Sequence, residues 1–101
     1  MSEISKLDQN LIIRKIDSET INIQIPNNTM LMSIVGQFDQ NLKELERLTN
    51  TIVFFRGNSI TCKGKETNLK DFSEAIKFLT SKYLLTNLIE KGDIIKWKDL
   101  K

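Results

Sequence analysis

The sequence contains no histidine, and only one cysteine, one proline and four glycines occur among its 101 residues. Because histidine is the commonest general base and a frequent zinc ligand, its absence excludes histidine-based catalytic triads and most zinc sites. A single cysteine, Cys62, cannot build a disulfide framework, which fits a reducing compartment. These absences make a catalytic domain the poorer prediction for this chain.

Long apolar runs are also missing. No stretch of about 18 apolar residues occurs, so no membrane-spanning helix is expected. The N-terminal segment MSEISKLDQN is polar and acidic, unlike a secretory signal. We therefore expect a cytoplasmic protein with no membrane partner. The hydrophobic share of 40% and the charged share of 28% are those of an ordinary globular domain, and the length suits a single one.

The net charge of +2 divides unevenly along the chain. Residues 1–50 hold five basic and seven acidic residues, a net charge of −2, whereas residues 51–101 hold ten basic and six acidic residues, a net charge of +4. This asymmetry permits contact with nucleic acid but does not require it, because a solvated lysine-rich surface is the simpler explanation.

Hydrophobic periodicity predicts a mixed order of strands and helices. The apolar run at 11–16 and the strict alternation at 21–25 predict strands, and Asp17–Thr20 between them reads as a turn. The later elements are expected to be a short helix at 29–35 ending at Gly36, a second helix from a cap at Asp39 to Asn50, strands at 51–55 and 59–62 around a Gly57-Asn58 turn, and a long helix from about residue 67 to Gly92.

These elements predict an α+β domain, in which an antiparallel sheet of three or slightly more strands is covered by helices on one face. In the long helix, one apolar face carries Leu69, Phe72, Ile76, Leu79 and Tyr83. Further apolar residues widen that face toward the end of the helix and suggest burial on more than one side there, namely Phe78, Leu84, Leu85, Leu88 and Ile89.

Several apparent catalytic or ligand-binding signals have simpler structural explanations. Gly64-Lys65 is not a phosphate-binding loop, because Gly57 precedes Gly64 by seven residues and Glu66 stands where a hydroxyl is required. Cys62 is expected to be a small buried core residue. The carboxylate pairs Glu44/Glu46 and Asp71/Glu74 fit solvated helix faces. No cluster of side chains suggests a metal site.

The turn between the two short helices is more informative. The backbone N–H groups at the start of a helix favour phosphate. Polar or basic side chains adjoin this turn, and further cations lie on the second hairpin: Gln37, Asn41, Lys43 and Arg47, with Arg56, Lys63 and Lys65. If these groups align, they form a surface that follows a phosphate backbone; the alternative is an ordinary helix–turn–helix packing unit.

Two linked motifs resemble a known family. The segment Gly36–Glu46 follows the pattern G-x-x-D-x-N-L-x-x-L-E, and Arg56-Gly57-Asn58 leads into a strand that ends at Gly64. Together they resemble the N-terminal domain of PhoH-like proteins, the phosphate-starvation-inducible family of predicted ATPases. The resemblance extends over residues 21–91 in order and spacing.

This resemblance implies a KH-like fold of the type I order β-α-α-β-β-α, in which a GXXG loop clamps the nucleic-acid backbone. The loop position corresponds to 36–39, with Asp39 in place of the second glycine. The implied function is an accessory RNA-binding module that is not catalytic by itself. The nucleic-acid-binding residues are then expected to be Gly36, Gln37, Asn41, Lys43, Arg47 and Arg56.

The resemblance also implies a division of the chain and a set of partners. We expect a loose N-terminal arm at 1–10, the KH-like domain at 11–92 and a connector at 93–101 toward a missing ATPase domain, which alone would bind ATP and magnesium. No cofactor is expected in this chain. Expected partners are single-stranded RNA, the chain's own ATPase domain and further copies of the full-length protein.

A protein-interaction or assembly domain without RNA binding is the alternative function. Asp39 places a negative charge in the loop that should hold phosphate, and the first half of the chain is acidic. In this alternative the apolar tail residues Ile94, Ile95 and Trp97 form an interface, unless they pack on their own domain.

Overall fold

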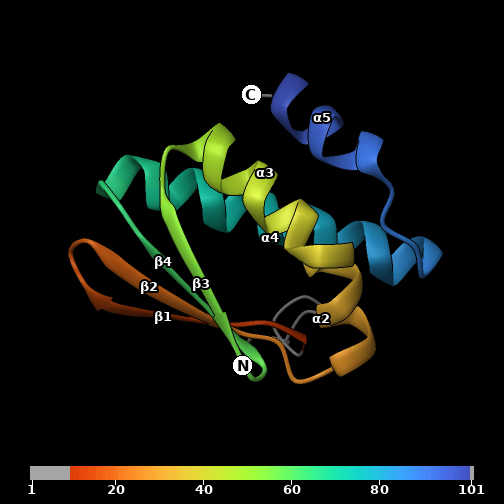
Figure 1. Cartoon of the computed structure of the whole chain (residues 1–101), viewed down its shortest axis with the longest axis horizontal. Coiled ribbons are helices and arrows are strands. Elements are labelled where there is room, and N and C mark those ends of the chain that lie inside the picture. The colour runs from red at the N-terminus through yellow and green to blue at the C-terminus, as the bar shows by residue number, and fades with distance from the viewer. Residues whose placement is uncertain (1–9, 101) are drawn as a thin grey trace, which may run out of the picture.

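The computed structural model describes residues 10–100 and contains a four-stranded sheet with helices packed on it (Figure 1). The segment from β2 to α4 follows the order β-α-α-β-β-α, which confirms the predicted α+β, KH-like fold. The elements are β1 (Ile12–Asp17), β2 (Thr20–Gln24), α2 (Asn28–Val35), the short 3-10 helix η1 (Gln37–Asp39), α3 (Gln40–Thr49), β3 (Ile52–Arg56), β4 (Ser59–Lys63), α4 (Glu66–Thr86) and α5 (Lys91–Asp99).

The sheet is antiparallel throughout and has the strand order β1-β2-β4-β3. β2 and β4 are central, so β1 and β3 form the two edges. Gly57 has φ +61° in the tight turn that joins β3 to β4, a conformation that glycine adopts without steric cost. β1 adds a fourth strand beside the three that belong to the β-α-α-β-β-α unit.

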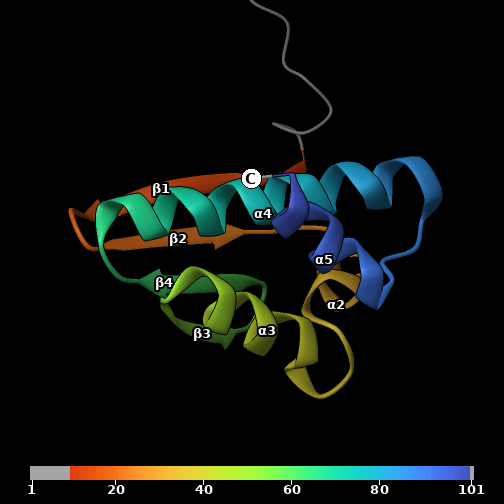
Figure 2. The same ribbon diagram turned by 90° about the horizontal axis from the view of Figure 1, so that it is seen from above.

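The core lies between one face of the sheet and the helices (Figure 2). The alternation of β2 and β4 directs Ile21, Ile23, Ile60 and Cys62 to this face, where all four are buried. The predicted apolar face of α4 is confirmed, because Leu69, Phe72, Ile76, Leu79 and Tyr83 are all buried in the same core.

The end of α4 was predicted wrongly. The helix ends at Asn87, whose φ of +59° and N–H bond to the Tyr83 carbonyl at 2.7 Å complete a left-handed cap. Glycine is the residue that most often takes this left-handed conformation at the end of a helix, and asparagine also takes it. Asn87 therefore terminates the helix five residues before Gly92. Leu84, Leu85 and Leu88 are exposed, and the apolar face therefore does not widen as expected; only Phe78 and Ile89 pack against the core.

The segment after Asn87 folds back as a separate helix, α5. Its start is a capping box between Glu90 and Asp93, in which each side chain accepts a hydrogen bond from the other residue's backbone N–H. Gly92 lies inside the first turn of this helix. Ile94 and Trp97 are buried in the shared core, whereas Ile95 is exposed. The tail thus packs on its own domain, and only one of its three apolar residues faces solvent.

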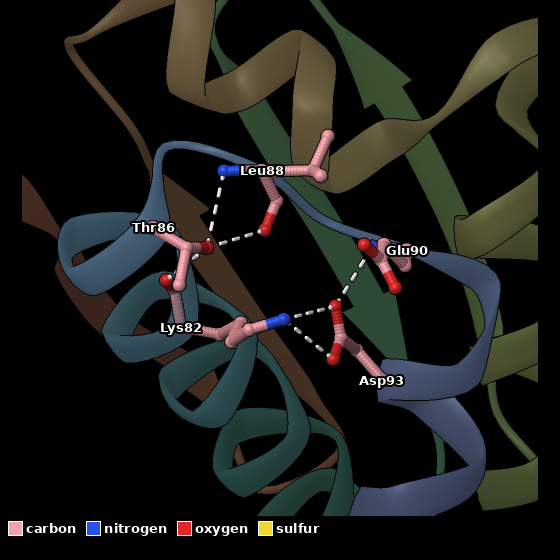
Figure 3. Close-up of polar contacts among 5 residues, drawn as sticks. All are labelled: Lys82, Thr86, Leu88, Glu90 and Asp93. Carbon is pink, nitrogen blue, oxygen red and sulfur yellow. Dashed lines mark hydrogen bonds and ion pairs between the residues drawn. The ribbon is translucent and has the colours of Figure 1, made fainter.

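A partly buried ion pair connects α5 to α4 (Figure 3). The Lys82 ammonium lies 2.9 Å and 3.1 Å from the two carboxylate oxygens of Asp93. Between the helices, the Thr86 hydroxyl accepts a hydrogen bond from the Leu88 N–H at 3.3 Å and lies 3.0 Å from the Leu88 carbonyl oxygen.

The division into an arm, a domain and a connector stays a prediction, and residues 1–9 of the expected arm lie outside the described part.

Candidate nucleic-acid interface

The loop between α2 and α3 has an unusual backbone. Gly36 has φ +82°, and Phe38 and Asp39 follow with φ +55° and +58°, which non-glycine residues rarely adopt. Phe38 is 83% exposed, so no packing contact of its ring explains this conformation. Strained backbone of this kind concentrates at binding sites, and it marks the loop as a candidate site.

Gly36 and Asn41 are fitted to each other. A Cβ atom at position 36 would lie 2.8 Å from both Cγ and Nδ2 of Asn41, so no other residue fits there without displacing that side chain. The Asn41 amide is buried and donates a hydrogen bond to the Ser33 carbonyl at 3.3 Å. Asn41 therefore braces the loop from the inside, whereas Gln37 at the surface is exposed.

Asp39 does not cap α3 through its side chain, contrary to the sequence prediction. It occupies the N-cap position in a left-handed conformation, and no side-chain hydrogen bond to the helix is formed. A capping side chain reaches the N2 or N3 amide from an extended backbone, which Asp39 does not have. Asn27, in contrast, has the extended backbone and accepts a hydrogen bond from the Met30 N–H at 3.0 Å, so it caps α2.

A groove runs between α3 and the edge strand β3. It is lined by Asp39, Leu42, Lys43, Glu46, Val53 and Phe55. The apolar part of this lining consists of Leu42, Val53 and Phe55. Glu46 was not expected there: its carboxylate accepts a hydrogen bond from the Val53 N–H at 2.7 Å. The groove therefore contains two carboxylates and one lysine.

The two basic residues of α3 lie in different surroundings. Arg47 forms an exposed ion pair with Glu44, one turn earlier on the helix. The hydrogen bond from Arg47 lowers the pKa of the Glu44 carboxyl and raises the pKa of the guanidinium. Lys43 is exposed at the groove and makes no ion pair with any residue in the described part of the chain. Lys43 is thus the cation best placed to meet a phosphate.

The structure brings some of the predicted site residues together and separates others. Gly36, Gln37 and Asn41 share the loop, and Lys43 and Arg47 follow it along α3. Arg56 is on β3, at the other face of the strand from Val53 and Phe55, because successive strand residues alternate. Sequence reasoning missed Glu46 as a groove residue, although the three-residue spacing of Lys43 and Glu46 already put both on one side of the helix.

Other kinds of site find little support in the structure. Within residues 10–100, no group of three or more cysteine, aspartate or glutamate side chains is arranged to hold a metal ion. Cys62 is buried, and burial raises the pKa of its thiol to about 11, although a hydrogen bond with Thr51 lowers it in part. In the described helices, no stretch is long and apolar enough to cross a membrane.

Comparison with known proteins supports the fold alone. No protein-family model matches the chain, and no curated protein matches it significantly. Among solved structures, Dim2p from Pyrococcus horikoshii OT3 is similar, with a TM-score of 0.64 at 14% sequence identity. The match covers 81% of this chain but 48% of the Dim2p chain, so this protein spans about half of that structure. Together with the order of its strands and helices, this likeness shows that the chain has a KH-like α+β fold.

Proposed function

We propose that this chain is an RNA-binding module that is not catalytic by itself. The observation that supports the proposal most directly is the groove between α3 and β3, which adjoins the strained loop at 36–39 in a KH-like fold. KH modules hold the backbone of single-stranded nucleic acid at this loop and place bases beside the second helix. Gln37 and Lys43 are exposed at the loop and the groove, where they can contact a phosphate.

The two carboxylates of the groove predict weak and salt-sensitive binding. Asp39 and Glu46 repel a nearby phosphate, whereas Lys43 attracts it, so the local charge is not strongly basic. Binding should therefore depend on a few cations and weaken as salt rises, in proportion to the number of phosphates that these cations contact. A groove of this composition suits an accessory module that acts next to another domain.

Titration of fluorescently labelled single-stranded RNA at low and moderate salt tests this proposal. The variant carrying both Lys43→Gln and Arg47→Gln should weaken binding at least fivefold and reduce the salt dependence, since each phosphate contact contributes about 0.7 to the logarithmic slope for single strands. The matched control carries Lys77→Gln and Lys98→Gln, which remove the same charge from exposed positions on α4 and α5. Binding without salt dependence, or equal loss in both variants, would contradict the proposal.

The finer proposal is that the module belongs to a PhoH-like ATP-binding protein. It rests on the two motifs at 36–46 and 56–64, and the comparisons do not name that family. In this proposal ATP and magnesium bind a separate domain, RNA is held near it, and the whole protein is cytoplasmic. The reading frame after Lys101 tests it: a G-x-x-x-x-G-K-[ST] motif is expected there, and its absence would contradict the assignment.

A protein-interaction or assembly domain is the second candidate function. It is favoured by Phe38, which is 83% exposed at the tip of the loop, and by the acidic groove. Sedimentation of the isolated chain at high concentration tests self-assembly. A monomer that binds RNA would refute this candidate, whereas an oligomer that Phe38→Ala dissociates would support it.

A further inference from the structure

Among residues 10–100, no helix covers the face of the sheet opposite α3 and α4, and this face has a distinctive composition. We name this surface the open face; it consists of Ile12, Arg14 and Asp17 of β1, Thr20, Asn22 and Gln24 of β2, Ile52, Phe54 and Arg56 of β3, and Ser59, Thr61 and Lys63 of β4. The strand register aligns these side chains in cross-strand rows, since directly paired residues point to the same face. Three of the twelve are basic, and one, Asp17, is acidic.

A central row of the open face joins polar groups to an aromatic ring. This row crosses all four strands: Arg14 pairs with Asn22, Asn22 pairs with Thr61, and Thr61 pairs with Phe54. The Asn22 amide donates a hydrogen bond to the Thr61 hydroxyl at 3.0 Å, which fixes the centre of the row. Phe54 at its end is 54% exposed. A half-exposed ring on the surface of a sheet is suited to stacking against another planar group.

A cation accompanies this ring. The Lys63 ammonium lies 5.9 Å from the centroid of Phe54, within the range of a cation–π contact. Arg14, Arg56 and Lys63 make no ion pair among the described residues. Asp17, the last residue of β1, is the one acidic residue of the open face; it is paired with Thr20, and its carboxylate accepts a hydrogen bond from the Glu19 N–H at 2.8 Å. The open face is therefore a cationic surface with a stacking ring.

The groove and the open face lie on the two sides of the same edge strand, β3. β3 is the edge strand; Val53 and Phe55 face the groove, and Phe54 and Arg56 face the open side. An extended polymer that leaves the groove at Phe55 passes the free edge of β3 and meets Arg56 and Phe54 next. The two surfaces are thus separated by the thickness of a single strand.

We propose that the open face is a second binding surface for single-stranded RNA, which takes the segment that leaves the groove. Phe54 stacks on one base, and Arg14, Arg56 and Lys63 contact phosphates beside it. Single-stranded RNA fits better than a duplex, because the bases of a duplex are already stacked on one another. Three cations and one carboxylate on the open face, compared with one cation and two carboxylates in the groove, match a polyanion. This inference rests on the proposed RNA-binding function.

Two labelled oligonucleotides separate the two surfaces. A tetranucleotide spans the KH loop and groove, whereas oligouridine of about twelve nucleotides also reaches the open face. Phe54→Leu, which keeps an apolar side chain but removes the ring, should weaken the longer oligonucleotide about fivefold to tenfold and leave the tetranucleotide unchanged. Lys63→Gln should weaken the longer one and reduce its salt slope by about 0.7. Lys77→Gln on α4 is the matched control.

The possible outcomes distinguish this inference from the proposed function. If Lys43→Gln weakens both oligonucleotides and Phe54→Leu weakens neither, the open face is not a binding surface and the groove alone binds RNA. If Phe54→Leu weakens the longer oligonucleotide and Lys43→Gln weakens neither, the open face is supported as a binding surface and the assignment of the groove is refuted. If neither oligonucleotide binds, both proposals fail. If Phe54→Leu only dissociates an oligomer in sedimentation, the face is a protein interface. Unchanged Trp97 fluorescence of each variant establishes that the fold is intact.

Discussion

The carboxylate of Glu46 accepts a hydrogen bond from the backbone N–H of Val53 at 2.7 Å, and this contact bridges α3 and the edge strand β3. Val53 directs this N–H away from β4, so Glu46 satisfies a donor at the edge of the sheet. The same contact holds a negative charge in the groove where RNA is proposed to bind. Glu46 therefore supports the edge strand and opposes the polyanion.

Replacing Glu46 tests these two roles separately. Glu46→Gln keeps a hydrogen-bond acceptor and removes the charge, so we expect RNA to bind a few-fold more tightly, by on the order of 0.5–1 kcal/mol. Glu46→Ala also removes the acceptor and should lower the free energy of unfolding by about 1–2 kcal/mol. Fluorescence anisotropy and thermal melting measure the two effects. Glu66→Gln, the same charge change at the exposed start of α4, is the control; weaker RNA binding by Glu46→Gln at unchanged stability would contradict the argument.

A methyl group at Gly36 should be costly. Gly36→Ala forces a Cβ to within 2.8 Å of the Asn41 side chain and places alanine at φ +82°, so we expect a loss of about 2–3 kcal/mol in the free energy of unfolding. For a domain of this size that loss lowers the Tm by roughly 10–20 °C.

Gly92→Ala is the matched control for Gly36→Ala. Nothing lies within 4 Å of a Cβ at Gly92, which sits in the first turn of α5, so alanine should be neutral or stabilise by up to about 1 kcal/mol. Equal destabilisation by the two changes would refute the explanation from the loop geometry.

The phenylalanine at the tip of the loop should be unfavourable for stability. Phe38 has φ +55° and is 83% exposed, so Phe38→Gly should relieve backbone strain without removing packing and should stabilise the fold by about 0.5–1 kcal/mol. Phe38→Ala keeps a Cβ and should gain little. Thermal melting compares the variants, and a clear loss of stability in Phe38→Gly would show that the ring makes contacts after all.

The ion pair between Lys82 and Asp93 should govern the docking of α5. Lys82→Met leaves the Asp93 carboxylate buried without its cation, so we expect a loss of about 1–3 kcal/mol. Trp97, the only tryptophan of the chain, is buried in α5 and reports the release of this helix by fluorescence. Lys77→Met, at an exposed position of the same α4, should leave the emission unchanged.

The same pair should make stability depend on acid. Burial alone would raise the pKa of Asp93, but the hydrogen bond from the Glu90 N–H, the Lys82 ammonium and the charge of Lys96 outweigh it and lower the pKa below 3.8. A carboxyl whose folded pKa is lowered stabilises the fold above its unfolded pKa, and this stabilisation is lost as pH falls through the folded value. The stability difference between the natural chain and Asp93→Asn should therefore persist at pH 7 and shrink below about pH 4. Denaturant titrations at both pH values measure it; a constant difference would contradict the pairing.

The thiol of Cys62 should be inert in the folded chain. Burial raises its pKa to about 11, so roughly a thousandth of it is thiolate at pH 8. An alkylating reagent should label it at the rate of unfolding, and promptly in denaturant. Rapid labelling of the folded chain would show that β4 opens locally.

Local patterns were sufficient for most of the fold. The alternation at 21–25, the turn at Gly57-Asn58 and the apolar face of α4 depend on neighbouring residues, and the structure confirms all three. The end of α4 was predicted wrongly because two cap residues competed and Asn87 preceded the favoured Gly92. The cap at Asp39 was wrong because residue type alone does not reveal the left-handed backbone that directs its side chain away.

The sequence by itself determined the order of strands and helices, the faces that are buried and the position of the loop, since hydrophobic periodicity and turn residues act over a few residues. Only the tertiary structure decided the charge of the groove, the docking of α5 and the composition of the open face. Each of these depends on which segments become neighbours: Glu46 meets Val53, Lys82 meets Asp93, and Arg14 aligns with Phe54 across four strands. Such contacts follow from strand register and helix packing, which periodicity along one segment does not specify.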